Sequence, residues 1–409
     1  GEDMKKVLLV APILTRSGYG EHARFVFAAI KNNPEIDLYI KPLNWGQSNW
    51  LFEDTKQRSE IDHFIQKTAQ SQNISFDLSI QVTIPNEWRE IAPVNIGVCA
   101  GIETDKVSRA WLKKANDMDK IIVVSNHSRD GFTKTEYTFG EFSNSDPIKL
   151  KCETPVEVVH YGVKDVVPTD LSLDLENDFN FLTVAQLGPR KNLENTIKWF
   201  VEEFLEEKVG LIVKAHWMNN SLLDRRKLTE VLQTSLEKYS DRKCSVHLLH
   251  GNMSDEEIHG LYINPKIKAY ITATHGEGFG LPIFEAAYSG LPVVAPSWSG
   301  HVDFLSAPVK NEKSGKVKKK ALYEKVSYEL KTPHQDALWS EVIEEDTKWC
   351  YPKEDKFKKA IRNAYQSNKL KKKEALQLQK HILSSFKMKD KLKQFNDIVT
   401  SMGENNEII

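Results

Sequence analysis

The sequence has few of the features that mark a disulfide-rich, metal-binding or strongly charged protein. Its four cysteines, Cys99, Cys152, Cys244 and Cys350, are far apart and form no C-x-x-C pair. This spacing suggests neither a zinc site nor a disulfide framework. Lysine plus arginine number 56 and aspartate plus glutamate 57, for a formal net charge of −1. The charge of the whole chain therefore gives no reason to expect nucleic acid or a membrane as a partner.

Long apolar runs are also absent. None approaches the roughly 18 residues that a membrane-spanning helix needs. The short run in MKKVLLVAPI leads into a glycine-containing loop, which is typical of a first buried strand rather than of a signal peptide. No internal repeat of fixed period is visible. We therefore expect a soluble, cytoplasmic protein, and 409 residues predict two domains rather than one.

Apolar, β-branched runs alternate with amphipathic stretches along the chain. The runs are VLLVAPI (7–13), IIVVSN (121–126), VEVVHYG (156–162), FNFLTVAQL (179–187), VGLIVKAHW (209–217), CSVHLLHG (244–251), AYITAT (269–274) and PVVAP (292–296). This alternation is typical of buried parallel strands wrapped by helices. It predicts an α/β protein with two Rossmann-like parallel-sheet domains that face each other across a cleft.

An acid-rich segment at 163–180 predicts the boundary between these domains. We expect the first domain over residues 1–166 and the second over 167–385. In residues 386–409, Leu392, Phe395, Ile398 and Val399 fall on one helical face. A terminal helix with a tail is therefore expected to pack back toward the first domain.

The stretch HGEGFGLPIFEAAYSG (275–290) places two acids, Glu277 and Glu285, around a glycine-rich loop. Pro282 suits the first turn of a helix, and Gly290 suits the position just past its end. Free N–H groups at such a helix start favour an anion, and a carboxylate accepts hydrogen bonds from two hydroxyls. The stretch therefore predicts a site for a phosphate linked to a sugar or ribose. The alternative is that Glu285 only complements the helix dipole and the glycines only turn the chain.

Two further loops follow predicted strands and open helices. In AQLGPRKN (185–192), Arg190 and Lys191 stand at a helix start, where two cations oppose the dipole unless an anion lies between them. They are interpreted as ligands of a diphosphate, with solvated loop charges as the alternative. In the first domain, Gly18 and Gly20 turn the chain after the first strand, and they would face the phosphate site of the second domain.

Two lysine-rich stretches occur near the C-terminus, KNEKSGKVKKK (310–320) and NKLKKKEALQLQK (368–380). The second has a helical pattern and is interpreted as a solvated face. The first contains Gly315, and a basic loop of this kind can hold nucleic acid or another anionic polymer through phosphate contacts. Nucleic acid therefore stays open as a partner.

With these residues in place, the sequence resembles the retaining glycosyltransferases of the GT-B architecture, in the large family numbered four, over roughly residues 5–385. GEGFGLPIFEA matches that family's EX7E motif, with Glu277 and Glu285 as its two acids. AQLGPRKN matches the segment that ends in the family's lysine, here Lys191. PVEVVHYGV, residues 101–132 and SWSGHVDFL resemble further family segments.

The resemblance implies a role for each matching residue. Glu277 would hold hydroxyls of the transferred sugar near the reacting carbon, while Lys191 and Arg190 would neutralise the departing diphosphate. The implied donor-binding residues are Gly18, Gly20, Gln186, Gly278, Phe279, Gly280, Leu281 and Glu285, the last of which would hold the ribose. The resemblance implies no metal site, and no cofactor besides the nucleotide-sugar substrate.

The sequence departs from the family pattern at two points. The family's arginine before the lysine is here Gln186, so Arg190 is a candidate substitute. The histidine often found in the N-terminal domain has no obvious counterpart. Acceptor-side candidates are Glu103, Asp105 and Trp45.

Several functions stay open on the sequence. The resemblance favours transfer of a sugar from a UDP- or GDP-sugar to an acceptor hydroxyl with retention of configuration. A DNA-modifying glycosyltransferase that acts on a hydroxylated base and a nucleotide-sugar epimerase are the alternatives. An inactive scaffold is disfavoured because Glu277, Lys191 and Glu285 are all present. The sequence identifies neither the acceptor nor the oligomeric state.

Overall fold

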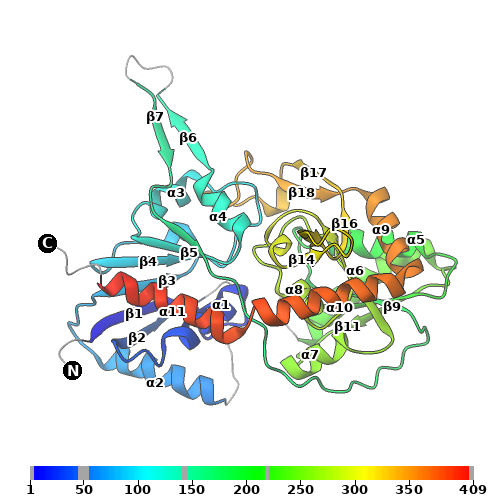
Figure 1. The fold of residues 1–409 in the computed structure, drawn as a ribbon, viewed down its shortest axis with the longest axis horizontal. Helices are drawn as coiled ribbons and strands as arrows, with labels where there is room; N and C mark the ends of the chain where they lie inside the picture. The colour runs from blue at the N-terminus through cyan, green and yellow to red at the C-terminus, as the bar shows by residue number, and fades with distance from the viewer. Residues whose placement is uncertain (1–3, 45–54, 141–145, 217–220, 405–409) are drawn as a thin grey trace. The chain divides into compact units, whose positions relative to one another are not determined.

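The computed structural model describes residues 4–44, 55–140, 146–216 and 221–404 (Figure 1). The chain divides into two compact units. The first comprises Gly1–Gly162, Leu338–Thr347 and Met388–Ile409, and the second comprises Val163–Ala337 and Lys348–Lys387. The N-terminal stretch of the first unit runs to Gly162, whereas the sequence predicted residue 166. The unit also includes Leu338–Thr347, which lies within the predicted second domain.

The first unit is built on a sheet of six parallel strands. Their spatial order is β2 (Ile36–Pro42), β1 (Lys5–Ala11), β3 (Leu78–Val82), β4 (Val94–Val98), β5 (Lys120–Val123) and β8 (Val156–Val158). Every residue of β1 from Val7 to Ala11 is buried. Because both faces of the strand are covered, it is a continuous apolar run without alternation.

Helices and one ribbon surround this sheet. The helices are α1 (Gly18–Ile30), α2 (Lys56–Gln70), α3 (Arg109–Ala115), α4 (Asn126–Thr133) and the short 3-10 helix η1 (Pro85–Glu87). Strands β6 (Glu136–Phe139) and β7 (Ile148–Lys151) pair antiparallel as a ribbon that extends away from the rest of this unit (Figure 1).

The last helix of the chain, α11 (Met388–Glu404), lies against α1 within the first unit. Phe395 is fully buried, and its ring makes an edge-on contact with Phe25, with centroids 6.3 Å apart. The amide of Asn33 donates to the side-chain oxygen of Asn396 at 2.8 Å. An apolar contact and a polar contact thus both tie the end of the chain to the helix that follows its first strand.

The segment Leu338–Thr347 is held by the first unit through polar contacts. The hydroxyl of Ser108 donates to the backbone carbonyl of Glu341 at 2.6 Å, and Lys106 pairs with Asp346 at 3.1 Å. The shortest of these contacts is accepted by a backbone oxygen. This explains why no side-chain pattern indicated that the segment belongs to the first unit.

The second unit has a parallel sheet of the same size. Its spatial order is β11 (Ser245–Leu249), β10 (Gly210–His216), β9 (Asn180–Gln186), β12 (Ile267–Ile271), β13 (Val293–Pro296) and β16 (Glu324–Val326). Two parallel sheets with helical connections confirm the predicted α/β fold class of two Rossmann-like units.

The remaining elements of the second unit are helices and two antiparallel pairs. The helices are α5 (Leu193–Glu203), α6 (Leu222–Leu236), α7 (Asp255–Tyr262), α8 (Leu281–Tyr288), α9 (Glu354–Gln366), α10 (Asn368–Ser385) and the 3-10 helices η2 (Glu237–Tyr239), η3 (Gly300–Phe304) and η4 (Gln335–Ala337). The pairs are β14 (Ser306–Lys310) with β15 (Val317–Ala321) and β17 (Tyr328–Lys331) with β18 (Trp349–Pro352). Within the described ranges, no helix is both long enough and apolar enough to cross a membrane.

His22 is a buried histidine in α1, in the core of the first unit. Its side chain stacks on Phe25 and meets Tyr161 edge-on, with ring centroids 5.7 and 5.0 Å away. Neither ring nitrogen has a hydrogen-bond partner among the described residues. Burial lowers the pKa of His22 from 6.5 to about 3, against a small opposite effect of Glu21. The imidazole is therefore neutral in the folded protein at physiological pH.

This burial makes the first unit sensitive to acid. Above about pH 6.5 His22 is mostly neutral in both the folded and the unfolded chain, so its titration does not change the stability there. Below that value only the unfolded chain takes up the proton, which costs about 1.4 kcal/mol of stability per pH unit until the folded pKa is reached. Urea unfolding should show that His22→Phe removes about 2 kcal/mol of the stability loss between about pH 6.5 and pH 5.

The matched control is His63→Gln, which changes an exposed histidine of α2 and should leave the pH dependence as in the wild type. Parallel pH profiles of the wild type and His22→Phe would contradict the assignment.

Candidate active site

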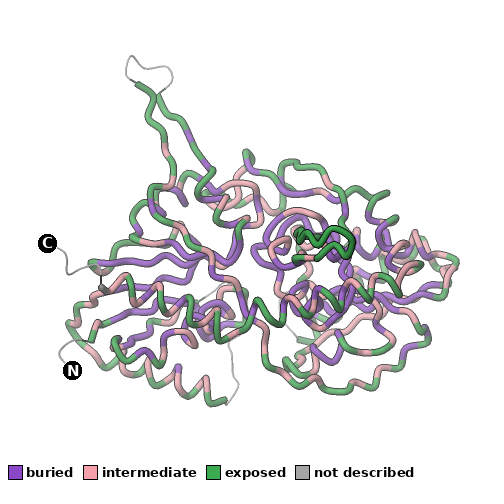
Figure 2. Tube along the Cα trace, viewed as in Figure 1, coloured by how far each residue is buried: buried purple, intermediate pink, exposed green. Residues whose placement is uncertain are grey.

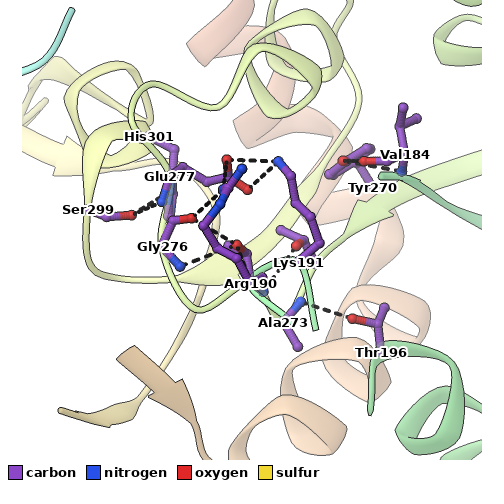
Figure 3. A network of polar contacts seen from close by, with 12 residues as sticks. Val184, Arg190, Lys191, Thr196, Tyr270, Ala273, Gly276, Glu277, Ser299 and His301 are labelled. Atoms are coloured by element: carbon purple, nitrogen blue, oxygen red, sulfur yellow. Dashed lines mark hydrogen bonds and ion pairs between the residues drawn. The ribbon is translucent and has the colours of Figure 1, made fainter. Parts of the chain in front are cut away.

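Three loops of the second unit meet at one edge of its sheet, where parallel strands end. They follow β9, β12 and β13 and cover residues 187–192, 272–280 and 297–299. Backbone and amide bonds join the first two loops: His275 N donates to the carbonyl of Arg190 at 2.9 Å, and the Asn192 amide donates to the carbonyl of Ala273 at 2.9 Å. Figure 3 shows the polar network that these loops form.

Glu277 is the centre of this network. The Lys191 ammonium donates to both of its carboxylate oxygens, at 2.8 and 2.9 Å. The Arg190 guanidinium donates to one of them at 3.1 Å and to the carbonyl of Gly276 at 2.8 Å. The structure thus brings together the three residues that the sequence placed at the reaction centre, and the anion that the two cations face here is Glu277 itself.

Two opposing effects set the charge of this carboxylate. The Glu277 side chain is only 6% exposed, and burial alone would raise its pKa. The charges of Lys191 and Arg190, with the hydrogen bond from Lys191, lower the pKa to about 2. The cations are more accessible, at 19% for Lys191 and 31% for Arg190. The group is therefore a buried, permanently ionised acid beside two cations that another anion can still reach.

The backbone of Glu277 is fixed as firmly as its side chain. Its N–H donates to the Ser299 hydroxyl at 2.9 Å, and its carbonyl accepts from the N–H of Gly300 at 2.8 Å. A β-carbon on Gly300 would lie 1.9 Å from the carbonyl oxygen of Gly278. Only glycine therefore allows the loop after β13 to pass so close to the glutamate loop.

Helix α8 begins directly after this loop, as the sequence predicts. Gly280 stands at its N-cap with φ of +90°, a conformation that glycine adopts without strain. Pro282 lies in the first turn, and Gly290 follows the helix end with φ of +83°. The Phe279 side chain, 3% exposed, packs on Phe284 and Phe304 at ring-centroid distances of 5.0 Å. Its side chain thus anchors the loop and does not itself line a ligand site.

Glu285 lies on α8 and is 9% exposed. One of its oxygens is 3.5 Å from Nε2 of His259. His259 Nδ1 donates to the carbonyl of Asp255 at 2.7 Å, so neutral Nε2 accepts from the Tyr288 hydroxyl at 2.6 Å. Burial lowers the pKa of His259, which keeps the ring neutral. His259 therefore does not hold Glu285 as an ion pair in the way that Lys191 and Arg190 hold Glu277.

Tyr270 on β12 lies close to both acids. Burial raises its pKa well above the ordinary value, and the negative charges of Glu277 and Glu285 raise it further. Its hydroxyl donates to the carbonyl of Val184 at 3.1 Å (Figure 3). Both carboxylates of the motif thus lie near enough to Tyr270 for their charges to act on its hydroxyl.

The two histidines that flank these loops are part of the framework. His275 Nδ1 is bonded to the carbonyl of Cys350 at 2.7 Å, and its ring stacks on Trp349. His301, fully buried, is bonded to the carbonyl of Pro296 at 2.6 Å. Each uses a ring nitrogen to hold a backbone oxygen.

Two residues of the β9 loop lie at the ends of regular elements. Asn192 is at the N-cap of α5 with φ of +53°, and its side chain makes no capping bond. Its amide donates to the carbonyl of Ala273 instead. Gln186 is an exposed residue at the carboxyl end of β9, and it stays a candidate for donor binding.

The predicted first-unit residues that the structure describes lie at the start of α1 and in the loop after β4. Gly18 and Gly20 begin α1, where a β-carbon on Gly20 would lie 2.1 Å from the carbonyl oxygen of Thr15. Glu103 and Asp105 are partly buried in the loop after β4. The charge of Glu103 contributes to the raised pKa of Tyr19, after burial and Cys99, so Glu103 lies near the start of α1. Trp45 lies outside the described residues.

Sequence reasoning missed two parts of this site. Ser299 and Gly300 position the glutamate loop, yet a hydroxyl and a close backbone approach leave no pattern in a single sequence. The segment SWSGHVDFL was noted only as a resemblance. Among the described residues, no group of three or more His, Cys, Asp and Glu side chains is placed to hold a metal ion.

Comparisons with known proteins point to one family. Residues 172–332 match the family model described as glycosyl transferases group 1. A 118-residue segment is 32% identical to the serotype-specific mannosyltransferase WbdA of Escherichia coli. The aligned segment covers 28% of this chain and 13% of the relative. The match thus spans a small part of that longer protein.

Solved structures show the same fold over nearly the whole chain. Sucrose-phosphate synthase from Thermosynechococcus elongatus aligns with a TM-score of 0.61 at 10% identity, over 98% of this chain and 100% of that one. A glycosyltransferase from Rickettsia africae aligns with a TM-score of 0.59 at 12% identity, also over 98% and 100%. At such low identity the likeness establishes the fold, which is the GT-B fold expected from the sequence.

Proposed function

We propose that this protein is a retaining glycosyltransferase, because residues 172–332 match the family model of glycosyl transferases group 1. It moves a sugar from a UDP- or GDP-sugar to an acceptor hydroxyl. The observation that carries the proposal is the buried Glu277 carboxylate, which Lys191 and Arg190 keep ionised beside the first turn of α8.

Glu277 stabilises the charge that forms on the sugar. When the bond from the sugar carbon to the diphosphate breaks, positive charge develops on the ring. A fixed carboxylate in a site of low dielectric stabilises that charge without reorganising during the reaction. Because the pKa of Glu277 is held at about 2, the group is anionic at physiological pH.

Lys191 and Arg190 serve the leaving group. The ammonium has three N–H donors and the guanidinium five, so both can hold a phosphate while they still contact Glu277. The backbone at the start of α8, from Phe279 to Leu281, adds an anion site of the kind found at helix N-termini. Fixed cations and N–H groups then neutralise the diphosphate without a metal ion.

Glu285 holds the ribose of the donor. Its neighbour His259 is neutral and already bonded at both ring nitrogens. A carboxylate beside a neutral imidazole suits a diol, since each of its oxygens can accept more than one hydrogen bond. This gives the two acids of the motif different partners and different tasks.

The proposed donor sugar comes from a sequence relative, and the proposed acceptor side comes from two acids of the first unit. The relative WbdA is named as a mannosyltransferase, so GDP-mannose is the first donor to test. Glu103 and Asp105 are proposed on the acceptor side, and an acceptor hydroxyl on a modified DNA base is one class to include in the panel. An epimerase is disfavoured because His275 and His301, the histidines flanking the loops, both hold backbone carbonyls.

Nucleotide binding tests the diphosphate assignment. UDP or GDP should raise the melting temperature, also in the presence of a chelator. Lys191→Ala should weaken binding of the nucleoside diphosphate by about tenfold or more, the scale of one charge-assisted hydrogen bond, and leave binding of the bare nucleoside nearly unchanged. Calorimetry measures both affinities.

Lys198→Ala is the matched control, because Lys198 is an exposed lysine on α5, and this variant should bind both ligands as the wild type does. Equal weakening of nucleoside and diphosphate by Lys191→Ala, or a strict need for added magnesium or manganese, would refute the assignment.

Steady-state kinetics separates the tasks of the two acids. Glu285→Gln should mainly raise the KM for the donor, because ribose contacts are the same in the ground state and the transition state. Glu277→Gln should lower kcat by about 10²-fold or more, the scale of losing one preorganised electrostatic group. Melting curves of both near-isosteric variants serve as the folding control. Full turnover by Glu277→Gln, or the same kinetic defect in both variants, would sink the proposal.

A further inference from the structure

The antiparallel pair β14–β15 forms a basic surface on the second unit, which we name the lysine ribbon and define as residues 306–321. Its lysines are Lys310, Lys313, Lys316, Lys318, Lys319 and Lys320, against a single acid, Glu312. All residues from 311 to 320 are exposed, and Figure 2 shows the ribbon as exposed along most of its length. The ribbon therefore concentrates positive charge in a chain whose net charge is −1.

These lysines are not used to hold the unit together. Elsewhere in the second unit lysines pair with acids, as Lys358 does with Glu202 at 3.5 Å. Among the described residues, no carboxylate lies within ion-pair distance of the six ribbon lysines. Six like charges on one short ribbon repel one another. This repulsion does not stabilise the folded unit, so the lysine cluster indicates binding to an external anion.

Helix α10 extends this surface. It contacts β14, and the charge of Lys319 adds to the effect of burial in lowering the pKa of His381 on α10. Exposed lysines of α10 are Lys369, Lys372, Lys373 and Lys380. The basic surface thus continues from the ribbon onto the helix.

Apolar side chains project from the same two elements. Val317 on the ribbon is 63% exposed, and Leu370, Leu376 and Leu383 on α10 are 56%, 48% and 44% exposed. Lysines interspersed with exposed aliphatic side chains suit the boundary between lipid headgroups and acyl chains. Neither the ribbon nor α10 contains arginine, phenylalanine, tyrosine or tryptophan, the side chains that proteins use to read or stack on nucleic acid.

We propose that the lysine ribbon, with the exposed face of α10, docks this protein on the surface of an anionic lipid bilayer. The ribbon has the four to eight clustered cations that are typical of binding to acidic lipids. The lysines supply the long-range attraction, and Val317 with the leucines of α10 enters the interface. The site is separate from Glu277 and Lys191, so it is independent of the proposed sugar transfer.

Flotation of the full chain with vesicles tests the proposal. Vesicles of phosphatidylcholine mixed with phosphatidylglycerol should carry the protein, vesicles of phosphatidylcholine alone should not, and added salt should release it. Changing Lys316, Lys318, Lys319 and Lys320 to Gln should weaken binding by at least about tenfold. Val317→Ser should also lower vesicle binding.

The matched control changes four exposed lysines at other places of the second unit, Lys198, Lys208, Lys353 and Lys356, to Gln. It has the same change in net charge and should bind vesicles as the wild type does. Absence of binding to anionic vesicles at low salt, or an equal loss in the control, would overturn the proposal. So would vesicle binding that is unchanged by Val317→Ser, or binding of duplex DNA without binding of vesicles. Melting curves verify that each variant is folded.

Discussion

The candidate site depends on one constraint, which is that a carboxylate buried in the second unit must stay charged. Glu277 is 6% exposed, and a buried carboxylate without a partner takes up a proton instead of staying ionised. Lys191 and Arg190 prevent this through three hydrogen bonds. The cost of bringing charge into the interior is thus offset locally, and the acid is kept in the form that can stabilise a cationic sugar.

The surrounding backbone holds Glu277 and its two cations in contact. Arg190 and Lys191 reach Glu277 because the loops after β9 and β12 are tied together by main-chain and amide bonds. Ser299 and Gly300 hold the backbone of Glu277 from the third loop. The positive φ of Gly280 then lets α8 start next to the acid. The glycines of this region therefore act through geometry, since they allow three chain segments to approach closely.

Much of the fold was predictable because its physical cause acts on side chains. Strands of a parallel sheet are covered on both faces, so they appear as continuous apolar runs, and α8 is marked by Pro282 and Gly290. The attachment of Leu338–Thr347 to the first unit was not predictable, because Ser108 binds a backbone carbonyl there. Likewise, the two cations at the start of α5 favoured an anionic ligand, but the sequence did not indicate that both would contact Glu277.

The ionisation of Glu277 is the property on which the account rests, and carbon NMR of protein labelled at the glutamate carboxyl groups measures it directly. Glu277→Gln identifies the resonance by its loss. The account predicts that the Glu277 signal stays that of a carboxylate from neutral pH to below 4.5, the ordinary glutamate value, and begins to change only as the pH approaches about 2. A midpoint at or above 4.5 would show that Lys191 and Arg190 do not hold the charge, and would contradict the central claim.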